Sequence, residues 1–151
     1  MAASTGTVTT VAGTYDAITD EVVSGAEAAY RQFRENDPTF LERIDLDVEW
    51  IVPDSLPGGG ALRGQLAVLE FMDSTSRLWE DAYPEPEELL PAGDALVVLG
   101  TWRARARSTG VRLAIPFAHV LRYRNGKLVY LRNYMDPTTA LRSLEPEGPA
   151  G

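Results

Sequence analysis

The chain has 151 residues, of which 44% are hydrophobic and 24% are charged, which is the size and composition of one globular domain with a core large enough to be stable alone. Its formal net charge of −8 at pH 7 argues against nucleic acid as a partner, because phosphate binding depends on clustered Lys and Arg. The basic stripe of Arg103, Arg105 and Arg107 alternates with apolar residues. It therefore predicts the solvated face of a strand.

Targeting, membrane and metal signals are also absent from the sequence. No apolar run approaches the roughly 18 residues of a membrane helix, so no membrane partner is expected, and residues 1–13 lack the regions of a secretion signal. We expect a flexible leader at 1–13, a single domain at 14–145, a flexible tail at 146–151 and a cytoplasmic location. With no cysteine and one histidine, disulfides and thiolate metal sites are excluded. We expect no metal and no cofactor.

The first half of the chain is predicted to be mainly helical. Apolar periodicity and breaker residues predict helices over 16–35, 38–43 and about 63–81, a strand over 45–52 and a loop over 53–60. The first helix can be interrupted near Ser24-Gly25, and Pro84 and Pro86 close the third. The predicted strand has one apolar side, made of Leu46, Val48, Trp50 and Val52.

The second half reads almost wholly as strands. The predicted strands cover 87–90, 95–108, 113–124 and 128–135. Asn125-Gly126 is the strongest short hairpin signal, and Asp136-Pro137 opens a last helix because Asp favours the N-cap and Pro the first helical position. We therefore predict an α+β fold, with one curved antiparallel sheet wrapped over the helices. Such a sheet leaves a conical cavity, which is the default site for a ligand.

His119 is the only side chain that titrates near neutral pH, and it is either a packed core residue or a functional group. Strand alternation places it on one face with Leu113, Ile115, Phe117, Leu121 and Tyr123. Asn133 is the single polar residue on a face shared with Val129, Leu131 and Met135. On the long strand, Trp102 lies beside the small residues Gly100, Ala104 and Ala106. These three faces suit the walls of a pocket.

The register of the hairpin at Asn125-Gly126 decides what lies opposite the histidine. A plain two-residue turn pairs His119 with Arg132, whereas a bulged turn, one residue longer, brings His119 and Asn133 onto one face. Burying an imidazole against a charged arginine is costly, which favours the bulged register.

Several segments together point to a family. In chain order they are Glu49-Trp50-x-x-Pro53, Leu62-Arg63-Gly64, Gly93-Asp94, Pro116-Phe117-Ala118-His119, Gly126-Lys127 and Tyr134-Met135-Asp136. This order resembles the SnoaL-like branch of the NTF2-like superfamily over about residues 20–145. The resemblance implies a cone-shaped α+β barrel that is usually a homodimer through the outer sheet face. The members include polyketide cyclases, ketosteroid isomerases, limonene-type epoxide hydrolases, polyether-forming cyclases and pure binding domains.

The sequence departs from each known acid/base set of this family. Asn133 stands where the resembled cyclases and hydrolases use an aspartate, and an amide cannot take up a proton. The hydrolases also use an Arg and an Asp where this chain carries Gly100 and Trp102. Ketosteroid isomerases carry aspartates where Val52 and Ala118 stand here. Tyr30 can match their helical tyrosine donor or be a packing residue.

The leading hypothesis is a cofactor-free cyclase or isomerase of antibiotic or other secondary-metabolite biosynthesis, acting on a small hydrophobic, oxygenated, polyketide-like metabolite. His119 and Asn133 are the candidate catalytic residues, by His-assisted proton transfer or by preorganisation of the substrate in the pocket. The alternatives are a non-catalytic ligand-binding or dimerisation module and, third, an epoxide hydrolase or epoxide-opening cyclase. The expected substrate-binding residues are Tyr30, Trp50, Trp102, Ile115, Phe117, Leu131 and Met135. Asp136 is expected to cap a helix.

Overall fold

The computed structural model describes residues 14–56 and 59–144, so the leader and tail predicted at the two ends lie outside the described residues. The elements in chain order are α1 (Asp20–Arg34), η1 (Pro38–Arg43), β2 (Ile44–Val52), β3 (Gly60–Arg63), α2 (Gln65–Leu78), β4 (Trp79–Ala92), β5 (Ala95–Ala106), β6 (Arg112–Arg124), β7 (Lys127–Tyr134) and α3 (Pro137–Arg142). No helix among the described residues is long and apolar enough to cross a membrane.

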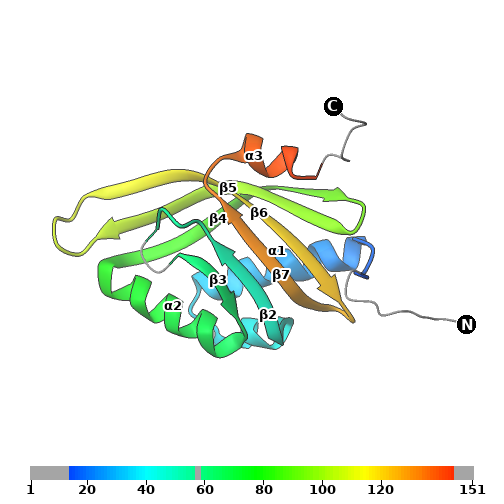
Figure 1. Cartoon of the computed structure of the whole chain (residues 1–151). Coiled ribbons are helices and arrows are strands. Elements are labelled where there is room, and N and C mark those ends of the chain that lie inside the picture. The colour runs from blue at the N-terminus through cyan, green and yellow to red at the C-terminus, as the bar shows by residue number, and fades with distance from the viewer. Residues whose placement is uncertain (1–13, 57–58, 145–151) are drawn as a thin grey trace, which may run out of the picture.

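The strands form one curved, open sheet with the order β3-β2-β7-β6-β5-β4, and α1 lies behind it in Figure 1. The predicted α+β architecture, with helices first and long strands afterwards, is confirmed. The sheet is antiparallel except at one place, because β2 runs parallel to β7. That pair brings the N-terminal half against the C-terminal meander.

The first helix is shorter than predicted and begins at Asp20, where the Oγ1 of Thr19 caps it by accepting a hydrogen bond from the backbone N–H of Val22. The residues before it bind the hairpin turn. The Asp16 carboxylate accepts hydrogen bonds from the backbone N–H groups of Asn125 and Gly126. The helix is not interrupted near Ser24-Gly25, since α1 is continuous through these residues.

The edge strand β4 corrects the prediction of a helix that continues to residue 81 and closes at Pro84 and Pro86. The helix ends at Leu78, and both prolines lie inside a fourteen-residue strand. Proline is tolerated there because an edge strand leaves one row of backbone groups unpaired. Gly100 of β5 lies opposite Pro86. A Cβ at Gly100 would lie 2.1 Å from the carbonyl oxygen of Glu85 and 2.9 Å from the Phe117 ring, so the room that we expected beside Trp102 is already filled.

Two smaller features of the first half also differ from the prediction. Residues 60–63 form strand β3 instead of leading into the helix, and the chain turns at Gly64 with φ of 90° before α2 begins at Gln65. In β2, the register against β7 shifts between Ile44 and Glu49. Leu46 lies in this irregular stretch and is 74% exposed, so it does not share the buried side predicted for it.

The β6–β7 hairpin has the bulged register that the sequence favoured. Its two-residue turn at Asn125-Gly126 has positive φ at both residues, and Arg124 lies opposite Lys127. The extra residue lies in β7, between the partners of Arg122 and Tyr123, and not in the turn where it was predicted. Beyond this bulge His119 lies opposite Asn133. The bulge therefore places the two candidate residues side by side on the inner face of the sheet.

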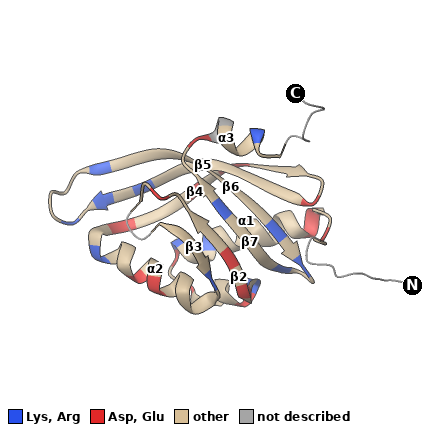
Figure 2. Cartoon of the chain, viewed as in Figure 1, with Lys and Arg blue, Asp and Glu red and all other residues tan. Residues whose placement is uncertain are grey.

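Both faces of the sheet are covered, at least in part. The inner face packs against α1, with Val48, Leu96, Val98 and Phe117 in the core. On the outer face, α3 lies over the sheet in Figure 1 and buries Ala140 against Ala95, Ala118 and Val120. The Asp136 carboxylate accepts a hydrogen bond from the hydroxyl of Thr139 at the start of this helix, which agrees with a capping role. Figure 2 shows acidic and basic residues dispersed over helices and strands alike.

Candidate functional site

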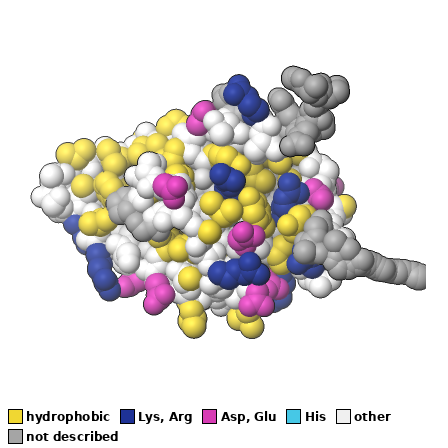
Figure 3. Space-filling view, in the orientation of Figure 1, with side chains coloured by type: hydrophobic (Ala, Val, Ile, Leu, Met, Phe, Trp, Pro, Cys, Tyr) yellow, Lys and Arg dark blue, Asp and Glu magenta, His cyan; other side chains and the backbone are white. Residues whose placement is uncertain are grey.

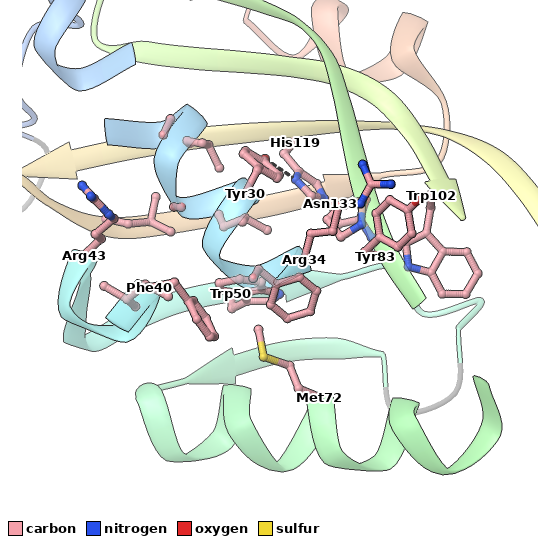
Figure 4. A pocket seen from close by; sticks show the side chains of 18 of the residues that line it. Tyr30, Arg34, Phe40, Arg43, Trp50, Met72, Tyr83, Trp102, His119 and Asn133 are labelled. Carbon is pink, nitrogen blue, oxygen red and sulfur yellow. Dashed lines mark hydrogen bonds between the residues drawn. The ribbon is translucent and has the colours of Figure 1, made fainter. Parts of the chain in front are cut away.

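A cavity of about 1040 Å³ lies between the inner face of the sheet, α1, η1 and the end of α2. Its lining is rich in aromatic side chains (Figure 4), which are Tyr30, Phe33, Phe40, Trp50, Phe71, Trp79, Tyr83, Trp102 and Tyr123. All three tryptophans of the chain are among them. The volume falls at the upper end of the range for small-molecule sites, and a lining of this kind suits an apolar ligand with few polar groups.

The polar centre of this cavity is a hydrogen bond between a helix and a strand. The hydroxyl oxygen of Tyr30, on α1, lies 2.6 Å from Nδ1 of His119, on β6, as the dashed line in Figure 4 marks. The two rings stack with their centroids 5.8 Å apart. The Phe117 ring lies on the same strand, 4.3 Å from the imidazole centroid. These contacts hold the imidazole in one orientation.

Burial keeps both partners of this hydrogen bond neutral. It lowers the pKa of the His119 imidazole to about 3, and it raises the pKa of the Tyr30 phenol well above its usual range, with a further contribution from Tyr123. Tyr30 is therefore the donor that satisfies both groups. The reverse arrangement would leave the phenol hydrogen without an acceptor among the described residues. In the favoured tautomer Nδ1 accepts, and Nε2 carries the imidazole hydrogen.

The second ring nitrogen of His119 is the one left for a ligand. Nε2 has no hydrogen-bond partner among the described residues, while His119 lines the cavity. The imidazole is 8% exposed, and no histidine is visible on the outer face shown in Figure 3. The site therefore presents one neutral N–H donor to the interior of the cavity.

Asn133 lies directly across from His119 in the β6–β7 pair. Its Oδ1 atom is buried and has no hydrogen-bond partner among the described residues. An unsatisfied buried acceptor costs about 1–3 kcal/mol, and such a group calls for a partner, protein or otherwise. Together, Asn133 and His119 offer an acceptor and a donor within one patch of an otherwise apolar wall.

The structure brings most of the predicted site residues together. Tyr30, Trp50, Trp102, Leu131, His119 and Asn133 all line the cavity. It does not bring Ile115, Phe117 and Met135 to this wall. Phe117 is buried against Gly100 and His119, and Ile115 lies opposite Trp102 in the part of β6 that leads to the hairpin with β5. Met135 lines a second, smaller cavity of about 430 Å³, which shares Asn133 with the first.

Sequence reasoning did not assign several cavity residues to the site. The additional lining side chains include Arg34, Arg43, Met72, Trp79 and Tyr83. Trp79 ends up edge-on to Trp102, with ring centroids 5.4 Å apart. The aromatic and proline content of 79–86 is the available signal, and it also fits the end of a helix. In the edge strand, Trp79, Tyr83 and Pro84 line the cavity.

The acidic groups of the cavity form no hydrogen bond at its polar centre in the described structure. The carboxylates that line the cavity belong to Glu21, Asp73 and Asp81, all on exposed residues. Among the described residues, no three His, Asp or Glu side chains come together as a set of metal ligands. No carboxylate hydrogen-bonds to His119 or Asn133 within the described part of the chain. The arrangement therefore suits hydrogen bonding to an oxygen more than transfer of a proton to a carboxylate.

Comparison with known proteins agrees with this fold. The family model described as a SnoaL-like domain matches residues 26–131. No curated protein matches the sequence. Among solved structures, an NTF2-like protein of unknown function from Burkholderia pseudomallei is 27% identical, with a TM-score of 0.70 over 85% of this chain and 100% of that one.

Two further structures extend the comparison. TerC, co-crystallised with polyporic acid, is also 27% identical, with a TM-score of 0.70 over 82% of this chain and 96% of TerC. A protein proposed to be a SnoaL-like polyketide cyclase, from Mesorhizobium loti, is 16% identical, with a TM-score of 0.61 over 75% of this chain and 97% of that one. At that identity the last likeness shows the fold alone. The match of the family model over most of the domain shows that the chain belongs to the SnoaL-like family, within the NTF2-like superfamily.

Proposed function

We propose that the protein is a cofactor-free cyclase or isomerase that acts on a hydrophobic, carbonyl-bearing metabolite. The observation that carries this proposal is the Tyr30–His119 hydrogen bond of 2.6 Å, which fixes a neutral imidazole with Nε2 available to the cavity. A carbonyl oxygen in the cavity accepts the Nε2–H hydrogen bond. Charge that develops on this oxygen in an enolate or alkoxide strengthens the bond, so the donor favours the transition state over the bound substrate.

The low pKa of His119 decides between its two candidate roles. A general base works best when its pKa lies near the working pH, and a pKa of about 3 makes this imidazole a poor proton acceptor. A neutral imidazole can still polarise a carbonyl as a hydrogen-bond donor. We therefore assign His119 the electrophilic role, and Tyr30 the positioning role of holding the ring in the tautomer that donates.

The proposed ring closure needs no base from the protein. A substrate with several carbonyl groups supplies its own enol, whose carbon attacks a second carbonyl carbon of the same molecule. The π bond of that carbonyl breaks, and its oxygen, held by Nε2–H, becomes an alkoxide. The enol O–H proton passes to water, and water returns one to the alkoxide. The aromatic wall contributes by folding the flexible chain into this reactive conformer, which removes entropy before the reaction.

The likeness to TerC supports an oxygenated apolar ligand. TerC has the same fold at 27% identity and was co-crystallised with polyporic acid. The cavity described above has the aromatic lining and the paired donor and acceptor, at His119 and Asn133, that such ligands need. Polyporic acid is therefore a sensible first compound for a binding screen of this protein.

The proposal is tested by exchange of the α-protons of β-tetralone in heavy water, followed by proton NMR, because cyclisation and isomerisation both pass through an enol or enolate. We expect the protein to accelerate exchange at least about tenfold over buffer, since one donor to a developing oxyanion contributes up to about 100- to 1000-fold. The variant His119→Phe removes the donor and is expected to abolish the acceleration. Glu27→Gln, on the exposed side of α1, is the control and keeps it.

The absence of carboxylates at the polar centre also favours a second candidate function, a non-catalytic ligand-binding module. In that case β-tetralone or polyporic acid quenches the fluorescence of the cavity tryptophans, while exchange stays at the rate of buffer. Equal exchange by the wild-type protein and His119→Phe, with folding intact by circular dichroism, contradicts the catalytic proposal.

A further inference from the structure

A second polar spot lies in the same cavity, away from His119. Arg43, at the end of η1, and Tyr123, on β6, both line the cavity. Figure 4 shows Arg43 and Trp102 at opposite ends of the view, with His119 between them. His119 and Tyr123 share one face of a regular strand and are four residues apart, so their backbones are separated by about 13 Å.

Arg43 differs from the other arginines of the cavity in its pairing. Arg34 lies 3.6 Å from a carboxylate oxygen of Glu85, and Arg107 is 3.9 Å from one of Glu80. Within residues 14–56 and 59–144, Arg43 has no ion-pair partner; its Nε donates to the side-chain oxygen of Gln32 at 3.1 Å. This bond orients the guanidinium and leaves both terminal nitrogens available.

The surroundings of Arg43 leave space for a ligand. Gly25, in the middle of α1, faces the guanidinium, and a Cβ placed there would lie 3.5 Å from Nη1. Glycine inside a helix costs about 1 kcal/mol relative to alanine. A glycine beside an unpaired cation, in spite of this cost, favours a role for the open space next to the guanidinium. The Tyr123 hydroxyl has no hydrogen-bond partner in the described part of the chain. Burial raises the pKa of Tyr123 to about 12 although the nearby Arg43 lowers it, so the phenol remains a donor.

We propose that Arg43 and Tyr123 bind a carboxylate of the same ligand whose carbonyl lies at His119. A planar guanidinium with two free terminal nitrogens matches a carboxylate in a bidentate geometry, and the tyrosine hydroxyl adds a third donor. This inference rests on the proposed function and narrows it: the substrate is an extended, apolar carboxylic acid whose oxygenated group is remote from the acid. Glu21 lines the cavity one helical turn before Gly25 on α1, and it forms no ion pair with Arg43 in the described structure.

The binding test uses the three cavity tryptophans as reporters. The probes are a series of ω-benzoylalkanoic acids of increasing chain length and their methyl esters, titrated at pH 7.5 while tryptophan fluorescence is followed. We expect each acid that reaches both spots to bind about ten- to hundredfold more tightly than its ester, because charge-assisted hydrogen bonds are stronger than neutral ones. In Arg43→Met this advantage disappears, while the esters bind as before.

Two further variants keep the test decisive if Arg43→Met unfolds. Gly25→Leu fills the space beside the guanidinium and is expected to remove the same acid-over-ester preference without touching Arg43. Arg34→Met is the matched control, because that arginine also lines the cavity but is already paired with Glu85, and it keeps the preference. Glu21→Gln is expected to tighten acid binding.

Two results would overturn the inference: equal affinity of acids and esters for the wild-type protein, or an acid preference that survives both Arg43→Met and Gly25→Leu. The proposed function is judged separately, by β-tetralone exchange, which involves no carboxylate. If the protein accelerates exchange but does not discriminate acids from esters, the proposed function stands and the carboxylate site at Arg43 and Tyr123 is contradicted. A preference for acids without accelerated exchange supports the carboxylate site at Arg43 and contradicts the proposed catalysis.

Discussion

The hydroxyl of Tyr30 and Nδ1 of His119 lie 2.6 Å apart although 89 positions separate the two residues in the chain. This bond ties the middle of α1 to the middle of β6. It satisfies a phenol hydrogen and an imidazole nitrogen that are both buried. One hydrogen bond therefore connects the helical layer to the sheet and also sets which imidazole nitrogen faces the cavity.

Removing this hydroxyl is expected to weaken both the fold and the site. Tyr30→Phe leaves Nδ1 of His119 buried without a donor, which costs about 1–3 kcal/mol of unfolding free energy, and it frees the ring to exchange tautomers. Urea denaturation measures the first effect, and β-tetralone exchange measures the second. Tyr83→Phe, another cavity tyrosine, whose ring lies under Arg34, is the control and keeps both values within error.

The depressed pKa of His119 predicts how stability depends on pH. The imidazole has a pKa of about 3 in the folded protein and about 6.5 when unfolded, so between these values the unfolded chain binds the extra proton. Stability is therefore highest above pH 6.5 and falls as the pH is lowered toward 3, by about 1.4 kcal/mol per pH unit from this group. Urea denaturation at several pH values should show a shallower fall for His119→Phe. Parallel curves for the two proteins would contradict the buried, neutral imidazole.

Replacing Asn133 tests its proximity to the imidazole. Asn133→Asp places a carboxylate opposite His119, and an adjacent negative charge favours the imidazolium, so the pKa of His119 should rise. Because the chain has one histidine, a single set of imidazole NMR signals followed against pH gives this pKa without assignment. Asn36→Asp, at another position on the cavity lining, should leave it unchanged. An unshifted pKa in Asn133→Asp would show that the two side chains do not interact.

Two glycine substitutions are expected to have opposite effects. Gly100→Ala puts a methyl group 2.1 Å from the Glu85 carbonyl oxygen and 2.9 Å from the Phe117 ring, so β4 must move away from β5, and we expect a loss of about 1–3 kcal/mol. Gly25→Ala adds a Cβ in ordinary contact with Arg43 and is expected to stabilise α1 by about 0.5–1 kcal/mol. Thermal denaturation of both variants measures the difference. A stabilising Gly100→Ala would contradict the close approach of the two strands.

Local patterns in the sequence predicted most of the antiparallel meander β5-β6-β7, but not the pairing of β7 with β2. Alternation predicted β5, β6 and β7 to within a few residues, and Asn125-Gly126 predicted the turn between β6 and β7. Each of these signals acts over a short distance along the chain. The parallel pairing of β2 with β7 depends on residues about 80 positions apart, and no local pattern encodes it. The sequence favours the bulge only indirectly, because without it His119 would be buried against the charged Arg132.

The site was predictable only in part for the same reason. His119 and Asn133 were identifiable as single polar residues on apolar strand faces, and each lines the cavity. Arg43 looked like the last residue of a short polar helix, and only the arrangement of η1 against α1 shows that its guanidinium faces an interior space. The segment 79–86 was misassigned because prolines end helices and also occur in edge strands.

The composition of β4 has a consequence for the behaviour of the protein in solution. An open sheet exposes the backbone of its outermost strand, which can pair with the same strand of another molecule and start aggregation. Pro84, Pro86 and Pro91 cannot donate a hydrogen bond along this strand, and the exposed carboxylates of Glu87 and Glu88 add like charges that repel a second copy. The prolines that looked like a helix terminator thus protect the longest exposed edge of the sheet against uncontrolled self-association.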